Sequence, residues 1–183
     1  MNPAINYAIT NDSVKTVIFS MSGGYINQKR SITGGFMDIH YVDEKPEESK
    51  DIIFKESMRK TLKLLIDAQK NIIFTTSIPR LNFNPQSCVN SRPLQLTNKA
   101  LKSPCAVSRA AFDEDQREYR DIAFSVLKEF PQVKVFDAAA ELCDREYCYA
   151  MKNSKMLYRD NVHLSQQGSE YIAQKLVKAI NLE

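Results

Sequence analysis

The chain has 183 residues, enough for one hydrophobic core, and we expect a single domain over residues 1–183. With 43% hydrophobic and 26% charged residues its composition is that of an ordinary globular protein, and no apolar run approaches the ~20 residues that span a bilayer. The net charge is +3, and the basic residues are scattered among acidic ones, which argues against nucleic acid as a partner.

The first half of the chain alternates strand and helix patterns. Residues 14–20, VKTVIFS, form a short apolar run before glycines and predict a buried strand. Residues 23–49 show no sustained period, so we expect a long irregular segment there. Residues 51–70 predict an amphipathic helix, and residues 71–79, NIIFTTSIP, predict a second strand that ends at proline. The apolar face of the predicted helix consists of Ile53, Met58, Leu62, Leu65 and Ile66.

The second half continues the alternation after an interruption. Residues 79–112 have no clean period and predict a second long loop. Residues 113–131 predict a helix that begins at its acidic cluster, because acidic side chains favour a helix N-terminus. Residues 132–143, QVKVFDAAAELC, predict a third strand that runs into a helical turn. Together these patterns predict an α/β protein, a three-layer α/β/α sandwich with a mainly parallel sheet.

The last predicted element is a helix that begins after Ser165, which is a candidate N-cap. Apolar residues recur along this segment at helical spacing and form one predicted inward stripe. The stripe consists of Ile172, Leu176, Val177 and Ile180.

The four cysteines are spaced as two local pairs. Cys88 and Cys105 bracket part of the second loop, and Cys143 and Cys148 bracket a very short one, so two local disulfides are the natural pairing. Four cysteines allow three connectivities, and a zinc site and four reduced buried thiols are the alternatives. Disulfides imply an oxidising compartment, yet the N-terminal residues lack the pattern of a signal peptide.

One short segment could carry chemistry: LYRDNVHLSQQGSEYIA, residues 157–173, places Asp160 three residues before His163. A carboxylate bonded to one imidazole nitrogen fixes the tautomer and leaves the other nitrogen free to take a proton from a hydroxyl nucleophile. The spacing alone is weak, because a surface histidine near an aspartate is the commoner outcome.

This segment resembles the closing block of SGNH hydrolases, and the chain is closer still to the extracytoplasmic SGNH domain fused to bacterial membrane acyltransferases of the acyltransferase-three type. The resemblance runs through KTVIFS, FKESMRKTLKLLIDAQKNIIFTTSIPRLNFNP, the spaced Cys88 and Cys105, VKVFDAAAELCDREYC and the Asp-His block. It implies a flavodoxin-like SGNH fold in which Asp160 and His163 are catalytic. It also implies a membrane-linked O-acyltransferase (acetyltransferase) that modifies cell-envelope polysaccharide such as lipopolysaccharide, on the periplasmic face, without cofactor or metal.

The serine of such a triad is not found where the resemblance requires it. The family carries it in a G-D-S-H block at the end of the first strand, and these residues contain no such block. We therefore expect the chain to be N-terminally incomplete, to lack the first strand, to follow an upstream membrane portion and to be inactive alone. Ser20 and Ser22 are weaker candidates within the chain, because the G-x-S-x-G elbow is absent.

No functional role is assigned to the remaining polar features. Ser22 and Gly23 stand where family members often have Arg-Trp, so no oxyanion donor is assigned. His40 is expected to be a solvated histidine, and the pairs Gly23-Gly24 and Gly34-Gly35 lack the ending of a phosphate-binding loop.

Three functions follow from the sequence. The leading hypothesis is an acyl-transfer domain that acts on an acyl donor and a glycan acceptor. The alternatives are an SGNH esterase or deacetylase, in which water replaces the sugar, and a noncatalytic remnant or partner-binding module.

Overall fold

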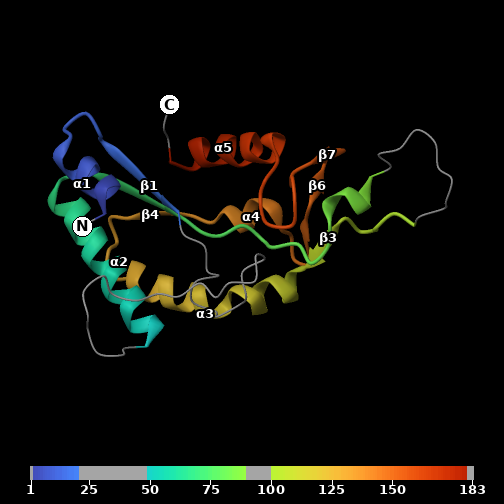
Figure 1. The fold of residues 1–183 in the computed structure, drawn as a ribbon, viewed down its shortest axis with the longest axis horizontal. Coiled ribbons are helices and arrows are strands. Elements are labelled where there is room, and N and C mark those ends of the chain that lie inside the picture. The colour runs from blue at the N-terminus through green and yellow to red at the C-terminus, as the bar shows by residue number, and fades with distance from the viewer. Residues whose placement is uncertain (1, 21–48, 90–99, 181–183) are drawn as a thin grey trace. The chain divides into compact units, whose positions relative to one another are not determined.

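The computed structural model describes residues 2–20, 49–89 and 100–180 (Figure 1). These residues belong to two compact units. The first unit comprises Met1–Thr76 and Gln116–Phe136, and the second comprises Ser77–Asp115 and Asp137–Glu183.

The first unit is built on a parallel sheet. Strands β1 (Thr16–Ser20), β2 (Asn71–Thr75) and β4 (Lys134–Phe136) lie in the order β1-β2-β4. Five residue pairs align β1 with β2, from Thr16 opposite Asn71 to Ser20 opposite Thr75. Parallel strands need crossover connections, and helices supply them here. The predicted α/β class and parallel sheet are confirmed.

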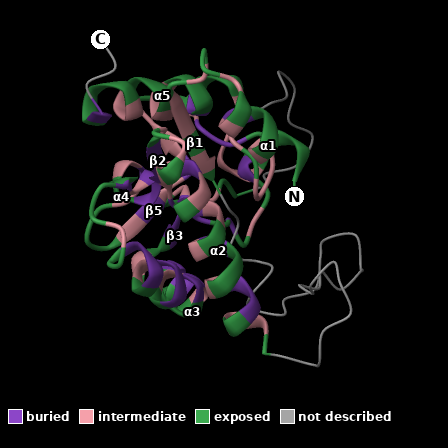
Figure 2. Cartoon of the chain, turned by 90° about the vertical axis from the view of Figure 1, so that its left-hand side faces the viewer, coloured by how far each residue is buried: buried purple, intermediate pink, exposed green. Residues whose placement is uncertain are grey.

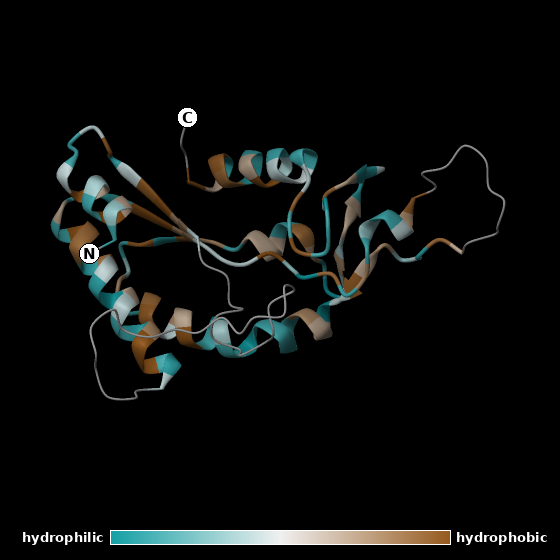
Figure 3. Cartoon of the chain, in the orientation of Figure 1, coloured by the Kyte–Doolittle hydropathy of each residue, from teal (hydrophilic) through white to brown (hydrophobic). Residues whose placement is uncertain are grey.

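Helices of the first unit cover the sheet with apolar side chains. They are α1 (Pro3–Thr10), α2 (Lys50–Asp67) and residues 116–127 of α3 (Arg109–Leu127). Helices α2 and α3 both have an apolar side and a polar side, and their apolar positions are mainly the buried ones (Figures 2 and 3). Their buried residues form one core with those of the strands: Phe54, Met58, Leu62, Leu65, Ile72, Phe74, Tyr119, Ile122, Ala123, Val126, Leu127 and Val133, with Ala8 of α1.

Two predictions for this unit have different outcomes. The inner face of α2 is as expected, with Ile66 only partly buried. The strand at β1 was predicted to be buried, which is wrong, because its residues are partly or fully exposed and 51% of Ile18 is accessible. Among the described residues β1 pairs only with β2, which places it at the edge of the described sheet.

Helix α3 begins one turn earlier than its acidic cluster suggests. The hydroxyl of Ser108 accepts the N–H of Ala111 at 3.2 Å, so a serine caps the helix. Asp113 lies in the second turn, where its carboxylate accepts a hydrogen bond from Arg109 Nε at 2.9 Å. The predicted start at Asp113 was wrong because this i, i+4 pair explains the acid as well as a helix N-terminus would.

The second unit has short elements joined by loops. Strand β3 (Ala106–Ser108) pairs antiparallel with β5 (Tyr147–Tyr149), and β6 (Met151–Lys152) pairs with β7 (Lys155–Met156). The helices are α4 (Ala138–Leu142), α5 (Gln166–Ile180) and the 3-10 helix η2 (Pro85–Cys88). Residues 79–112 therefore include η2, β3 and the start of α3, and are not one irregular loop.

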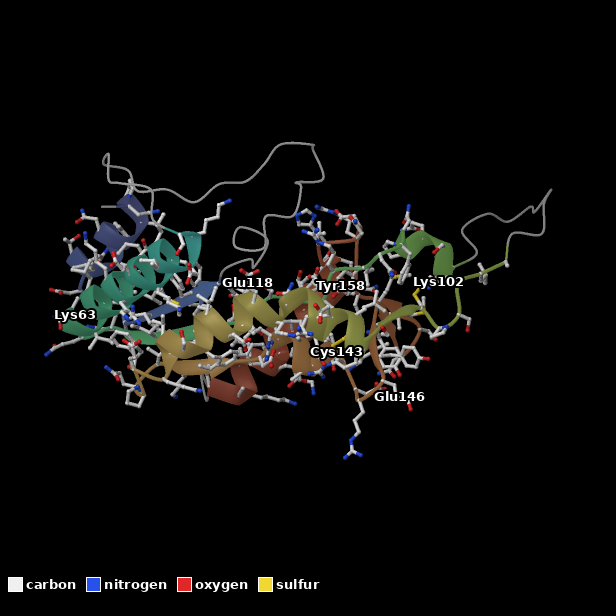
Figure 4. All side chains as sticks on the ribbon, turned by 90° about the horizontal axis from the view of Figure 1, so that it is seen from below. Lys63, Lys102, Glu118, Cys143, Glu146 and Tyr158 are labelled. Atoms are coloured by element: carbon white, nitrogen blue, oxygen red, sulfur yellow. A yellow bond between two sulfur atoms is a disulfide. The ribbon has the colours of Figure 1, made fainter. Side chains whose placement is uncertain are left out.

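The second unit is held by a small core and two cross-links. Its buried residues are Leu81, Val107, Phe112, Ala139, Leu142, Cys148, Ala150, Leu157 and Tyr158. Disulfides join Cys88 to Cys105 and Cys143 to Cys148, which is the predicted pairing; Figure 4 labels Cys143. In α5, Ile172 packs against this core, but 40% of Val177 is exposed and its predicted inward position was wrong.

Candidate active site

The Asp-His segment forms a closed loop between β7 and α5. Tyr158 and Leu164 form an antiparallel bridge, and the N–H of Arg159 donates to the carbonyl of His163 at 2.9 Å. Tyr158, labelled in Figure 4, is 1% exposed and donates its hydroxyl hydrogen to the carbonyl of Pro79 at 2.8 Å. These bonds fix both ends of the loop while its tip stays at the surface.

Asp160 organises the tip of this loop. Its Oδ1 accepts the N–H groups of Val162 at 2.9 Å and His163 at 2.8 Å. Hydrogen bonds to the charged form favour ionisation, so the Val162 N–H, together with the His163 ring, lowers the pKa of Asp160 far below its ordinary range. Asp160 is therefore a carboxylate at neutral pH.

The His163 ring faces this carboxylate. Its Nδ1 lies 3.0 Å from Asp160 Oδ1 and 2.9 Å from Oδ2. An ionised carboxylate can only accept, so Nδ1 carries the hydrogen and Nε2 of the neutral ring is left with its lone pair. The side chain of His163 is 63% exposed. An arrangement of this kind can orient a histidine as a general base, with Nδ1 held by the carboxylate and the side chain largely exposed.

The start of α5 is anchored directly behind the loop. Ser165 Oγ donates to the carbonyl of Met156 at 2.7 Å and accepts the N–H of Gly168 at 3.0 Å, so the predicted N-cap is confirmed. A Cβ on Gly168 would lie 2.0 Å from the carbonyl oxygen of Leu157. The absence of a side chain at residue 168 thus lets α5 approach the backbone that leads into the loop.

A pocket of about 490 Å³ opens beside Asp160. It lies within the second unit, because the N–H of Leu81 donates to the carbonyl of Asn161 at 2.8 Å and joins the segment after β2 to the Asp160 loop. The lining residues are Leu81, Asn82, Phe83, Asn84, Gln86, Arg159, Asp160 and Asn161. Sequence reasoning identified only Asp160 among them, since nothing local in NFNPQ signals that it faces an aspartate far along the chain.

The other sequence candidates are placed differently. Ser20 is exposed and ends β1 in the first unit. Ser22, Gly23, His40 and the two Gly-Gly pairs lie outside the described residues. Within the described part of the chain, no cluster of three or more His, Cys, Asp or Glu side chains is arranged to hold a metal ion.

Comparison with protein families places the chain in a known family. The family described as the SGNH domain fused to AT3 domains matches residues 2–178, which include both units and the Asp-His loop. The chain belongs to this family. No curated protein sequence gives a significant match to it.

Two solved structures resemble the fold. One is the periplasmic domain of the lipopolysaccharide acetyltransferase of Salmonella ser. Paratyphi A, with a TM-score of 0.57 and 18% identity. That match covers 98% of this chain and 61% of the other, so the chain spans less than two thirds of its length. The second, described as a candidate acylhydrolase from Bacteroides fragilis NCTC 9343, has a TM-score of 0.48 and 12% identity, with 97% and 66% covered.

Family membership also bears on location. Family members are fused to AT3 domains, which are membrane acyltransferases, and the Salmonella domain is periplasmic. The two disulfides are consistent with an extracytoplasmic site. In the described residues, no helix combines the length and apolar character needed to cross a membrane.

Proposed function

We propose that this SGNH domain serves a membrane-linked O-acyltransferase that transfers an acyl group, such as acetyl, to cell-envelope polysaccharide. The observation that carries the proposal is the His163 ring, which Asp160 holds by Nδ1 while the side chain stays 63% exposed. Membership of the AT3-fused family supports the same function. The proposed location is the periplasmic face of the membrane.

The proposed reaction has two acyl-transfer steps, and each moves one proton through His163. A serine hydroxyl from outside residues 1–183 attacks the donor carbonyl, and His163 Nε2 takes its proton and then gives it to the leaving group. A sugar hydroxyl next attacks the acyl-serine, losing its proton to Nε2, and the serine oxygen regains that proton as it leaves. Asp160 stabilises the imidazolium in both steps.

The test uses the complete membrane protein that carries this domain, with an acyl donor and de-O-acylated polysaccharide. His163→Ala should lower the rate of polysaccharide acylation about 10²- to 10⁴-fold, the contribution of a positioned general base. His40→Ala, which changes the other histidine, should leave the rate unchanged. Retention of more than a tenth of the wild-type rate by His163→Ala would overturn the proposal.

Two further measurements test the proposed origin of the nucleophile and the identity of the acceptor. Chain 1–183 alone should not turn over p-nitrophenyl acetate, and turnover that Ser20→Ala or Ser22→Ala abolishes would place the serine inside the chain. Release of free acetate without acylated polysaccharide would assign the site to an esterase.

A further inference from the structure

The pocket beside Asp160 shares a residue with the proposed acid-base pair without containing His163. Asp160 lines the pocket, and its carboxylate also accepts from His163 Nδ1 at 2.9 Å. Because the Leu81 N–H bonds to the Asn161 carbonyl at 2.8 Å, the two walls of the pocket are fixed to each other. A molecule in this pocket therefore lies next to the reacting centre.

The pocket wall is rich in carboxamides. Asn82, Gln86 and Asn161 line it, and their side chains make no hydrogen bond within the described residues. Asn84 differs, because its Oδ1 caps η2 by accepting the N–H of Gln86 at 2.9 Å. A carboxamide has both donors and an acceptor, which matches a hydroxyl group that itself donates and accepts. Convergent polar groups of this kind fix the orientation of a ligand in a pocket.

The charge of the pocket wall indicates which of the two proposed substrates, the acyl donor or the sugar acceptor, the pocket would bind. Arg159 and Asp160 are its charged residues, and they have opposite signs, with the guanidinium 3.5 Å from the carboxylate. The wall thus has no net charge to attract a phosphate or carboxylate. The apolar side chains among the lining residues are Phe83 and Leu81, and Leu81 is only 1% exposed, so the pocket offers little apolar surface to an acyl chain. Both points favour a neutral polyhydroxylated ligand over an anionic donor.

Phe83 offers one apolar surface to such a ligand. Its ring is partly buried, and the ammonium of Lys102, labelled in Figure 4, lies 4.6 Å from the ring centroid. The C–H face of a sugar ring is apolar and gains free energy on contact with an aromatic ring. The backbone N–H of Lys102 donates to the carbonyl of Ser87 at 2.9 Å, next to the Cys88–Cys105 bridge. This part of the pocket wall is therefore held in place before a ligand binds.

We propose that this pocket is the acceptor subsite, which binds a neutral sugar residue through the carboxamides of Asn82, Gln86 and Asn161. This inference rests on the proposed acyl transfer and adds the class of sugar and the residues that select it. The volume of about 490 Å³ lies within the range of about 300–1,000 Å³ typical of small-molecule sites.

The test is a titration of ¹⁵N-labelled chain 1–183, followed by the side-chain amide signals of asparagine and glutamine. The probes are a neutral oligosaccharide from de-O-acylated lipopolysaccharide of the producing organism, glucuronic acid and acetyl-CoA. The neutral oligosaccharide should shift the Asn82, Gln86 and Asn161 signals, and the two anions should not. Asn82→Leu and Gln86→Leu should each raise the Kd of the oligosaccharide about tenfold, the cost of one lost hydrogen bond.

Gln174→Leu is the matched control, because Gln174 is an exposed carboxamide on α5 that does not line the pocket, and its Kd should equal that of wild type. Three results would overturn the inference: no shift with oligosaccharide at about 10 mM, binding unchanged in both leucine variants, or shifts caused by acetyl-CoA alone. The spectra also report whether each variant is folded.

The proposed acyl transfer can be tested independently of sugar binding. His163 does not line the pocket, so His163→Ala should bind the oligosaccharide as wild type does while losing acyl transfer in the complete protein. If that variant keeps acyl transfer, the proposed role of His163 is wrong. The sugar titration then still decides whether the pocket binds a neutral sugar.

Discussion

The two units of this protein are held together by different kinds of interaction. The first unit buries the apolar faces of α2 and α3 against a parallel sheet. The second unit has short strands, two disulfides and hydrogen bonds between side chains and the backbone, such as those that Asp160 accepts and those that Ser165 and Tyr158 donate. The sites proposed for chemistry and for binding both lie in the second unit.

The comparison suggests how such a domain divides its tasks. A core of interdigitating apolar side chains is non-directional and tolerates many sequences, so it makes a stable frame. A reacting centre needs particular atoms within about 0.5 Å of their place, which directional hydrogen bonds and cross-links provide. The two units should therefore respond to different changes.

The largest effect is expected from a cavity in the first unit. Leu65→Ala should lower the free energy of unfolding by about 2–5 kcal/mol, since a buried leucine loses both transfer energy and packing. Leu65 is 0% exposed. Urea unfolding measures the change, with Ile52→Ala on the exposed side of the same helix as control, where 43% of the side chain is accessible. Equal losses in both variants would contradict a core at α2.

The next effect should be confined to the second unit. Replacing Cys88 and Cys105 by serine should cost about 3 kcal/mol in the chain-entropy model, and replacing Cys143 and Cys148, which close a shorter loop, about 2 kcal/mol. Amide hydrogen exchange, read residue by residue, should show faster exchange in the second unit with β1 and β2 protected as before. Equal loss of protection in both units would show that they unfold together and that the comparison fails.

Much of the first unit follows from hydrophobic periodicity. Ile53, Met58, Leu62 and Leu65 recur at helical spacing and are buried where that spacing predicts. The exposure of Ile18 could not be predicted, because a short apolar run such as TVIFS is compatible with an edge strand as well as with a central one. The start of α3 was missed because an acidic residue in a helix can pair with an arginine, as Asp113 does with Arg109, as well as favour its N-terminus.

Only part of the candidate site could be predicted from the sequence. Asp160 and His163 are close along the chain, so their pairing is a local property that spacing can suggest. The carboxamides of Asn82 and Gln86 line one pocket with Asp160, and long-range hydrogen bonds such as that from Leu81 to Asn161 join the two segments. No periodicity encodes such a bond, so pocket residues of this kind emerge only from the fold.

A smaller effect is expected where α5 meets the loop backbone. Gly168→Ala places a methyl group 2.0 Å from the Leu157 carbonyl oxygen, so either α5 or the backbone before Asp160 must move. Overpacking of this kind costs about 1–3 kcal/mol. Urea unfolding measures the cost, and amide shifts of residues 158–163 report the displacement. Ser169→Ala, one residue further along the same helix and exposed, should change neither; unchanged spectra in Gly168→Ala would refute the close approach.

The smallest effect concerns the charge on Asp160. Hydrogen bonds from Val162 and His163 hold its pKa below the ordinary value of 3.8, so the folded state binds this proton less readily than the unfolded state. The resulting stability is complete above about pH 5 and is lost as the pH falls below about 4. Asp160→Asn keeps an oxygen for both amides but removes the charge. Its deficit in unfolding free energy should therefore be present at about pH 5 and shrink by about pH 3, whereas the deficit of Ile52→Ala, which changes no titratable group, should be equal at both. A deficit in Asp160→Asn that is the same at both pH values would mean that the shape of the loop, and not its carboxylate, holds the His163 ring.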